Sequence, residues 1–576
     1  MKKLLAYVKG AWWAVLLAPL LMVLEVMMDL QLPTLMSQIV DNGIANGDLA
    51  YIGEKGVQML LCALVGIIGG AGCSLVAAIA SMSLGTNLRD GMFRKVQTFS
   101  FTELDRLQPS SIITRMTNDV TQVQNLMTQA LRMMVRAPMT CIGGIFYAWR
   151  LNPRLSVIFV VSLPLMLASA LIIMKKVVPL FLKAQKKIDR LNAITRENLL
   201  GMRVVKAFTA QTTEIERFSD TNDELTQCNI AAQKRMILMF PITTLITNLG
   251  VLAVLWFGGR MAIIPSEHMM EAGQIMAFVQ YMTQIMMSFM MFVMMASQFS
   301  RAQVSAGRIN EVLDTESSIL SPQDPKPLTD FSVSFENVSF AYSDGTEPVL
   351  SDLTFTLPYG QKVGIIGATG SGKSSLVSLI PRLYDTTSGT VRLGGTDVRE
   401  LALSDLRAHI GVVLQENVLF EGTIAENLRF GDRNADDEQL KEAATVAQAA
   451  PFIKGFDGQY EYPLEQRGRN LSGGQRQRMT IARALVRNPE ILILDDATSA
   501  VDLATEAAIL EGLDRRNGTT ILIAQRISTV LNCDQILVLD EGRLIDSGTH
   551  DELLNSCEVY RSIAVSQLGE EVLNRG

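Results

Sequence analysis

The chain of 576 residues has little of what builds disulfide-rich, metal-binding or nucleic-acid-binding proteins. Its six cysteines form no Cys-x-x-Cys pair, and only three histidines are present, so the sequence predicts neither a disulfide framework nor a zinc site. Charged residues make up only 19%, and the net charge of −7 indicates no nucleic-acid partner. The 42 glycines and 18 prolines follow no period, which excludes a collagen-like chain.

Hydrophobic residues make up 48% of the chain, and they are spread unevenly. Long apolar stretches occur only in the first part, at roughly residues 11–38, 56–82, 128–149, 155–178, 238–262 and 274–298. Each reaches the ~20 residues that a helix needs to cross a bilayer. After about residue 320, short apolar strands alternate with amphipathic helices, as in an α/β domain. The sequence therefore predicts a membrane domain of six transmembrane helices fused to one α/β domain.

The domain boundaries follow from composition. The proline-rich, polar segment 321–330 is a predicted linker between a membrane domain at 1–320 and a globular domain at 331–576. The N-terminus and the connections 83–127 and 179–237 are rich in Lys and Arg, which predicts that they and the globular domain face the cytoplasm of a cell membrane. Both connections are long enough to extend the membrane helices, with short crossing elements expected near 111–119 and 208–218.

A phosphate-binding loop is predicted at the start of the globular domain. An apolar strand runs into Gly367-x4-Gly372-Lys373-Ser374, and a helical pattern follows. In such a loop the backbone N–H groups face phosphate oxygens, Lys373 reaches the outer phosphates and the Ser374 hydroxyl binds Mg²⁺. The other expected nucleotide-binding residues of the loop are Thr369, Gly370, Ser371 and Ser375.

Two further motifs carry chemistry. An apolar strand at 491–494 ends in Asp495, whose carboxylate is predicted to hold Mg²⁺ through water. A second anion cradle precedes a helical pattern and consists of Leu471, Ser472, Gly473, Gly474 and Gln475. Because one domain rarely needs two phosphate cradles, we expect this second cradle to serve a nucleotide held by a partner chain.

These motifs, in this order, resemble the ATP-binding cassette family, and six spans ahead of the cassette resemble a half-transporter of the exporter type, with the type IV fold. The resemblance implies ATP and Mg²⁺ as cofactors and two cassettes that dimerise head to tail around two ATP molecules. It assigns Tyr342 to adenine stacking, with a buried structural tyrosine as the alternative. It assigns Gln415 to Mg²⁺ contact, residues 471–475 to the signature motif and Ser499–Asp502 to the loop that joins the two sites. The elements near 111–119 and 208–218 then correspond to coupling helices.

The chain departs from the family pattern where hydrolysis is carried out. Asp496 stands where the family usually has a glutamate that activates water, and Gln525 stands where it usually has histidine. A smaller departure is Gln466, where exporters often carry glutamate, although Glu465 is adjacent. The chain thus resembles the degenerate-site subunit of heterodimeric bacterial multidrug exporters, with a weakly hydrolytic site of its own and a non-identical half-transporter as partner.

The expected function is ATP-driven export of amphipathic compounds, drug-like or lipid-like, from the cytoplasm or the inner leaflet. The alternatives are a homodimeric exporter with slow ATPase, a lipid or peptide exporter, and an ATP-gated channel or regulatory subunit. Glu25 and Asp29, one turn apart in the first span, either lie on a substrate path or pair with another helix or the outer headgroups. The methionine-rich last span lines a substrate cavity or packs against its neighbours.

Overall fold

A computed structural model describes residues 2–263, 270–343 and 345–569 of the protein. The chain divides into two compact units, the first made of Met1–Gln97 and Ser110–Asp314, and the second of Thr98–Pro109 and Thr315–Gly576. The globular unit therefore begins a few residues before the predicted linker, and it includes a short segment taken from the first long connection.

The first unit is helical. Its main elements are α1 (Lys2–Leu5), α2 (Trp12–Gln38), the π-helical turn η1 (Ile39–Ile44), α3 (Leu49–Val96), α5 (Pro109–Thr114), the π-helical turn η2 (Arg115–Asp119), α6 (Val120–Leu151), α7 (Val157–Leu200), α8 (Met202–Ala207), α9 (Gln211–Met236), α10 (Met239–Ile263) and α11 (Ala272–Asp314). Each apolar stretch predicted from the sequence lies mainly within one of the long helices. At 1.5 Å per residue, the 48 residues of α3 span roughly 72 Å, well beyond the thickness of a bilayer.

Lower apolarity, and not length, separates α6 from the other long helices. Within the described residues, five helical stretches are long and apolar enough to cross a membrane: Trp12–Ile44, Leu49–Val96, Val157–Leu200, Gln211–Ile263 and Ala272–Val293. The predicted span 128–149 lies in α6, which has the length but not the apolarity, because Arg132 and Arg136 interrupt it. Since α6 packs against α2, α3 and α11, it belongs to the same bundle.

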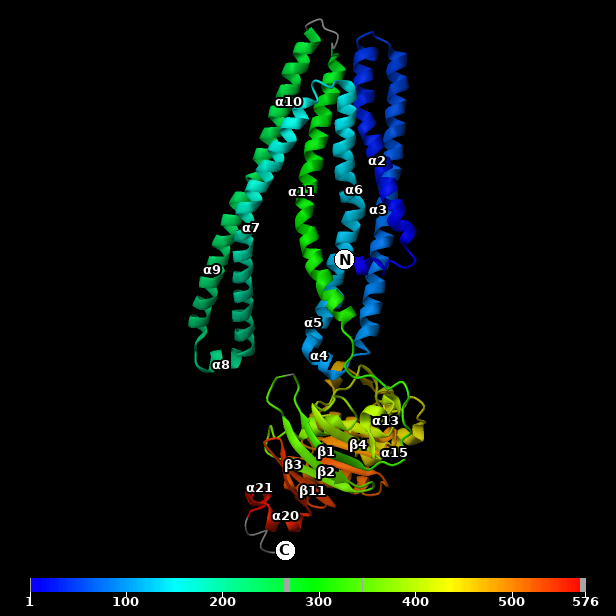
Figure 1. The fold of residues 1–576 in the computed structure, drawn as a ribbon, viewed down its shortest axis with the longest axis vertical. Helices are drawn as coiled ribbons and strands as arrows, with labels where there is room; N and C mark the ends of the chain where they lie inside the picture. The colour runs from blue at the N-terminus through cyan, green and yellow to red at the C-terminus, as the bar shows by residue number, and fades with distance from the viewer. Residues whose placement is uncertain (1, 264–269, 344, 570–576) are drawn as a thin grey trace. The chain divides into compact units, whose positions relative to one another are not determined.

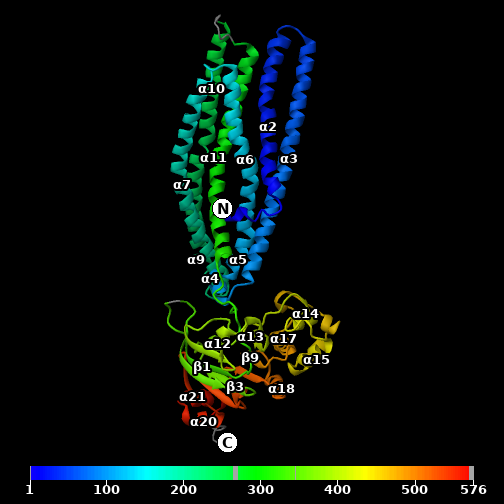
Figure 2. The ribbon, with the colours of Figure 1, turned by 45° about the vertical axis from the view of Figure 1, so that its right-hand side comes forward.

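The helices of the first unit form a bundle and an arm. In the bundle, α2 packs on α3 and α6 packs on α11, with further contacts between these pairs. The arm consists of α7, α9 and the short helix α8 at its tip, and Figure 1 shows it diverging from α11. The arm joins the bundle where α10 contacts both α7 and α11. Figure 2 shows the long helices running roughly along one axis.

Both short crossing helices lie earlier in the chain than expected. Helix α4 (Phe101–Leu107) begins at a capping box, in which Ser100 and Glu103 bond each other's backbone, and it ends at Gln108. The predicted element 111–119 is instead the continuous helical run of α5 and η2. In the second connection α8 precedes the predicted element 208–218, most of which belongs to α9.

The second unit is built on two main sheets. Its strands are β1 (Val333–Phe340), β2 (Leu350–Leu357), β3 (Lys362–Gly367), β4 (Ser388–Leu393), β5 (Thr396–Asp397), β6 (Ile410–Val413), β7 (Gly422–Thr423), β8 (Pro463–Leu464), β9 (Ile491–Asp495), β10 (Thr519–Ile523), β11 (Gln535–Asp540) and β12 (Arg543–Gly548). One sheet has the order β12-β11-β3-β10-β9-β6 and is parallel except for β12. The antiparallel sheet has the order β2-β1-β4-β5, and β7 pairs with β8.

The helices of this unit cover the sheets. They are α12 (Lys373–Leu379), α13 (Leu403–Ala408), α14 (Ile424–Arg429), α15 (Asp437–Val446), α16 (Ala450–Lys454), α17 (Gly473–Val486), α18 (Leu503–Leu513), α19 (Ile527–Val530), α20 (His550–Ser556) and α21 (Glu558–Leu568). Short 3₁₀ turns complete the unit: η3 (Val398–Glu400), η4 (Gln459–Glu461) and η5 (Gln466–Gly468).

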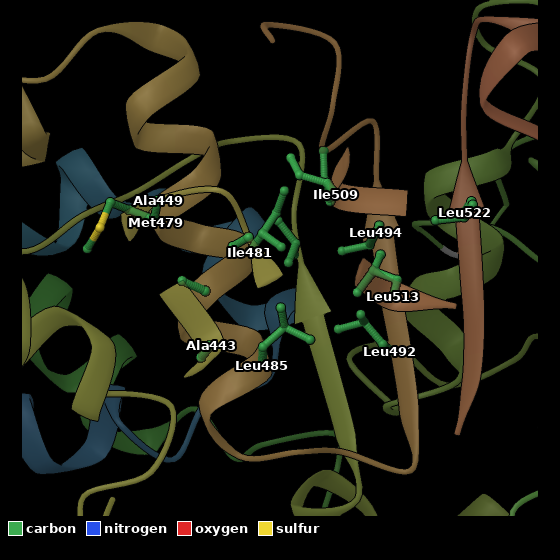
Figure 3. Close-up of a cluster of buried hydrophobic side chains, with 14 of the residues drawn as sticks. Ala443, Ala449, Met479, Ile481, Leu485, Leu492, Leu494, Ile509, Leu513 and Leu522 are labelled. Atoms are coloured by element: carbon green, nitrogen blue, oxygen red, sulfur yellow. The ribbon is translucent and has the colours of Figure 1, made fainter. Parts of the chain in front are cut away.

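The parallel sheet is buried on both faces, as its continuous apolar strands predict. In β9, Leu492 and Leu494 point into a core shared with α17 and α18, which Figure 3 shows, whereas Ile491 and Ile493 belong to the core on the opposite face. This alternation fixes the register of β9 and therefore the place where the strand delivers Asp495. The predicted fold class, a helical membrane domain fused to an α/β nucleotide-binding domain, is confirmed.

Candidate functional site

A cavity of about 260 Å³ opens at the carboxyl ends of β3, β9 and β10. This edge is where parallel α/β sheets bind ligands, because the loops there leave neighbouring strands in opposite directions. The residues predicted from separate motifs line the cavity together: Thr369, Gly370, Gly372, Lys373, Ser374, Ser375, Gln415, Asp495, Asp496 and Gln525.

The loop between β3 and α12 has the conformation of a phosphate cradle. Gly372 has φ +93°, and a Cβ there would lie 2.6 Å from the Leu350 side chain, so only glycine fits. The Lys373 ammonium donates to the carbonyls of Gly367, at 2.9 Å, and Ala368, at 2.8 Å. Burial lowers the pKa of Lys373, while the carboxylates of Asp495 and Asp496 oppose that shift. The Lys373 ammonium thus bonds to the loop itself, and we expect it to turn to a phosphate oxygen when a nucleotide binds.

The oxygen ligands beside the loop fit a magnesium ion. The Ser374 hydroxyl donates to a carboxylate oxygen of Asp495 at 3.0 Å, and Gln415 lines the same cavity. Mg²⁺ is held by one or two protein oxygens together with substrate phosphates, so this sparse set suits it. When bound, the ion would neutralise phosphate charge. Burial raises the pKa of Asp495, and the Asp496 charge adds to that effect.

Asp496 and Gln525 are in direct contact. The Gln525 amide donates to a carboxylate oxygen of Asp496 at 3.2 Å. Asp496 has φ +50°, and its backbone N–H donates to the Ile523 carbonyl at 3.1 Å, which joins the ends of β9 and β10. Burial raises the pKa of the Asp496 carboxyl, whereas a hydrogen bond from Ser499 and the Lys373 charge lower it. On balance the pKa of this carboxyl lies above that of an ordinary aspartate.

The signature residues form the N-terminus of α17. The Ser472 hydroxyl accepts from the Gln475 N–H at 3.3 Å, and the Gln475 side-chain oxygen accepts from the Ser472 N–H at 2.8 Å. The two bonds make a capping box. Gly474 lies against the following loop, where an added Cβ would come within 2.9 Å of the Ala500 carbonyl. The motif is intact, and α17 presents its N-terminus as an anion site.

A buried glutamine joins the signature helix to the hydrolysis residues. Gln477 is 1% exposed, and its amide donates to the Asp496 carbonyl at 3.1 Å and to the Ser499 hydroxyl at 3.3 Å. Its side-chain oxygen accepts from the Ala500 N–H at 2.9 Å. Sequence reasoning gave Gln477 no role. A signal was present, because this polar residue lies on the same helix face as Ile481 and Leu485, which are in the core.

The loop at Ser499–Asp502 is fixed at its other end as well. Asp502 caps α18, and its carboxylate accepts from the Thr505 N–H at 2.9 Å and the Thr505 hydroxyl at 2.7 Å. These hydrogen bonds lower the pKa of Asp502. Behind the loop, the buried Glu506 accepts from Thr498 and Thr529, each at 2.7 Å, which ties the loop to the segment that follows Gln525.

Tyr342 stands next to the cavity. Its hydroxyl lies 2.8 Å from that of Ser375, within hydrogen-bond distance, and its ring is 44% exposed. Phe340 and Tyr384 contact the ring edgewise, at 4.9 and 5.2 Å between centroids. An exposed aromatic face held beside the phosphate cradle suits stacking of a base, so the alternative of a buried structural tyrosine does not describe its position.

The remaining predicted residues lie elsewhere. In the membrane unit Arg136 of α6 forms ion pairs with Glu25 and with Asp29, the latter at 2.9 Å. These pairs hold α2 against α6, which is the helix-pairing alternative that the sequence left open. Glu465 and Gln466 are exposed at turn η5, and all six cysteines are free. Of the three histidines, His409 and His550 do not line the cavity, and His268 lies outside the described residues.

Comparison with known proteins agrees with this geometry. Residues 15–289 match the ABC transporter transmembrane region, and residues 350–499 match the ABC transporter family. The chain is 38% identical over 571 residues, 99% of each chain, to the uncharacterized ABC transporter ATP-binding protein YfiB of Bacillus subtilis. It is 34% identical over 475 residues, covering 82% of this chain and 75% of the relative, to a fatty acid ABC transporter ATP-binding/permease protein of Mycobacterium bovis.

A solved structure shows the same fold. A bacterial Atm1-family ABC exporter with ATP bound superposes with a TM-score of 0.81 at 25% identity, covering 96% of this chain and 99% of that one. The membrane unit, the cassette and the assembled phosphate site thus point to one family. The chain belongs to the ABC transporter family and is a half-transporter of the exporter type, with its membrane domain fused to the domain that uses ATP.

Proposed function

We propose that this chain is the degenerate-site half of a heterodimeric exporter, paired with a second, non-identical half-transporter. The observation that supports the proposal is the contact between Asp496 and Gln525 in the lining of the phosphate cavity. The phosphate cradle beside it is complete, from Gly367 to Ser375. A site built in this way binds ATP with Mg²⁺ and hydrolyses it slowly.

Two physical effects slow hydrolysis at this site. An aspartate is one methylene shorter than the glutamate usual in this family, and a displacement of about 1 Å from the water costs on the order of 10²-fold in rate. In addition, the Gln525 amide donates to the carboxylate and has no basic nitrogen to take up or relay a proton. The raised pKa of Asp496 makes the carboxylate a better base, but it does not lengthen the side chain.

The signature motif supports a shared site with the partner. Ser472 and Gln475 cap α17 as an intact anion-binding N-terminus, although this chain's own phosphate cradle lies elsewhere, between β3 and α12. In a head-to-tail pair, residues 471–475 close over the ATP held by the partner. Asp502 lies in the loop that joins the two sites. The competent site of the assembly is then made from the partner's cradle and this chain's signature residues.

The proposed cargo is an amphipathic compound, drug-like or lipid-like, taken from the cytoplasm or the inner leaflet of the cell membrane. Exposed methionines on α11 support this, because Met276, Met287 and Met291 offer flexible, polarizable side chains. The similarity to a fatty acid transporter favours the lipid-like class. Since Arg136 forms ion pairs with both Glu25 and Asp29, we place less weight on a cationic cargo drawn by these carboxylates. The basic residues of the two long connections favour a cytoplasmic location for the cassette and the N-terminus.

The test compares the chain alone with the co-purified pair. Alone, the chain should bind ATP and release phosphate far below 1–10 s⁻¹, roughly the range of typical enzymes. In the pair, Ser472→Arg in this chain should abolish ATPase activity, while Asp496→Asn should leave most of it. A homodimer would lose activity with either substitution. Fast turnover by the chain alone contradicts the proposal, and substrate accumulation in vesicles that requires hydrolysis separates a pump from an ATP-gated channel.

A further inference from the structure

A chain of side-chain contacts within the second unit joins α4 to the aromatic platform beside the phosphate cradle. The Tyr384 hydroxyl donates to the Asp105 carboxylate at 2.7 Å. The Tyr384 ring meets the Tyr342 ring at 5.2 Å with an interplanar angle of 87°, and Tyr342 reaches Ser375 of the cradle. Only one residue, Tyr384, thus separates α4 from the ring on which adenine is expected to stack.

Helix α4 is tied both to the segment around Ser318 and to the Tyr384 ring. The Glu103 carboxylate accepts from the Ser100 N–H in the capping box and also from the Ser318 N–H at 3.2 Å. Phe101 contacts the Tyr384 ring at 5.9 Å between centroids. Helix α4 lies in the chain between the membrane helix α3 and the helical run of α5, η2 and α6, so this segment of the second unit continues along the backbone into the membrane unit on both sides.

The Tyr384 hydroxyl is a permanent hydrogen-bond donor. Burial raises the pKa of Tyr384, and the hydrogen bond to Asp105 raises it further, so the phenol keeps its proton throughout the physiological range. The bond to Asp105 is charge-assisted and directional. The length of this hydrogen bond therefore depends on the position of the Tyr384 ring. That position depends in turn on the edge contact between the Tyr384 and Tyr342 rings.

We propose that Tyr384 is a positioning residue that reports the adenine base, separately from the triphosphate, to α4. A base stacked on Tyr342 restricts that ring, the edge contact restricts Tyr384, and the hydroxyl of Tyr384 fixes Asp105. The inference rests on the proposed role of Tyr342 in the nucleotide site. It separates the two parts of ATP, because a triphosphate without a base fills the cradle and leaves the aromatic contacts unchanged.

The experiment measures amide hydrogen exchange of residues 101–107 in the full-length chain in nanodiscs, with Mg²⁺ and either ATP or inorganic tripolyphosphate. In the wild type, ATP should slow exchange by about fivefold and tripolyphosphate should have no effect. Tyr384→Phe and Asp105→Ala keep the aromatic edge and remove the hydrogen bond, so ATP affinity should stay within about twofold while the ATP-dependent protection of α4 is lost. Tyr384→Leu removes the edge and should raise the Kd for ATP about fivefold, without changing that for tripolyphosphate.

Tyr359→Phe is the matched control. Tyr359 donates to the Glu490 carboxylate in the same unit, outside the cavity, so its loss removes the same kind of bond and should preserve the protection of α4. Protection that survives in Tyr384→Phe, or equal protection by tripolyphosphate, overturns the inference. If the wild type binds ATP no more tightly than tripolyphosphate, the base platform is absent and the inference fails. If it binds neither, the proposed function fails with it.

Discussion

The cradle for phosphate and the pair of residues that we propose faces the attacking water lie on the same edge of one sheet, but they depend on different kinds of structure. The cradle consists largely of backbone, with Lys373 buried and bonded to two carbonyls. The proposed hydrolysis pair consists of two side chains, those of Asp496 and the exposed Gln525, whose reach and chemistry we expect to decide the rate. Substitution of the pair should therefore leave binding intact, so that nucleotide binding is separable from turnover.

Loss of the cradle lysine should have the largest effect. Lys373→Ala removes an ammonium that lies in the cradle, so the Kd for ATP should rise by about 100-fold or more, as expected for charge-assisted bonds to phosphate. Isothermal titration of the full-length chain measures it. Lys326→Ala, which breaks an exposed pair with Glu400, should leave the Kd unchanged. Equal losses in the two variants would show that general charge, and not the cradle, holds the nucleotide.

Restoring the hydrolysis pair should have the next largest effect. Asp496→Glu combined with Gln525→His should raise phosphate release by the chain alone by up to about 100-fold, because it supplies both the longer base and an imidazole. Either single substitution should give roughly tenfold or less. The Kd for ATP should change little, since the cradle is untouched.

The control for this gain is Lys373→Ala added to the double variant, which should return phosphate release to background. A double variant that binds ATP as before but stays slow would place the defect outside the pair. The exposed turn at Glu465 and Gln466 would then be the next candidate.

A smaller effect is expected from the buried glutamine that links the signature helix to the pair. Gln477→Met keeps the length of the side chain but removes its bonds to Asp496, Ser499 and Ala500. We expect ATPase activity of the assembled exporter to fall about tenfold and stability by about 1–3 kcal/mol, with ATP affinity within twofold. Gln439→Met, at the exposed cap of α15, should lower stability slightly and leave the rate unchanged. A loss of binding in Gln477→Met would contradict the separation.

The sequence predicted the sheet edge well, because strand and loop lengths place motif residues at strand ends. Apolar strands leading into Gly367 and Asp495 sufficed to bring the magnesium ligands and the cradle into one cavity. The crossing helices were harder. The sequence placed a crossing element near 111–119, whereas the structure has a short helix at Phe101–Leu107 that begins at the capping box of Ser100 and Glu103.

Contacts between distant segments could not be predicted from local patterns. Tyr384 and Asp105 are 279 residues apart, and nothing in either neighbourhood indicates the other. Arg136 is a similar case, because its pairing with Glu25 and Asp29 depends on how α2 packs on α6. In the sequence Arg136 only interrupts an apolar stretch. The reason for a charge at this place is the pair of carboxylates on α2, which the structure brings beside α6.

The smallest predicted effect concerns pH and the metal ligand. Burial raises the pKa of Asp495, so as pH falls this carboxyl takes up a proton before an exposed aspartate does, and the protonated form cannot bind Mg²⁺. The sign follows: the advantage that Mg²⁺ gives to ATP binding should be full at neutral pH and should shrink in the acid range above the ordinary aspartate pKa, by about two- to fivefold. Titrations of ATP with and without Mg²⁺ measure this change.

Asp495→Asn is the control. It shows how much of the change comes from ATP itself, because this variant has no carboxyl to titrate there. If the wild type and Asp495→Asn lose their Mg²⁺ dependence in parallel, Asp495 is not the group that titrates.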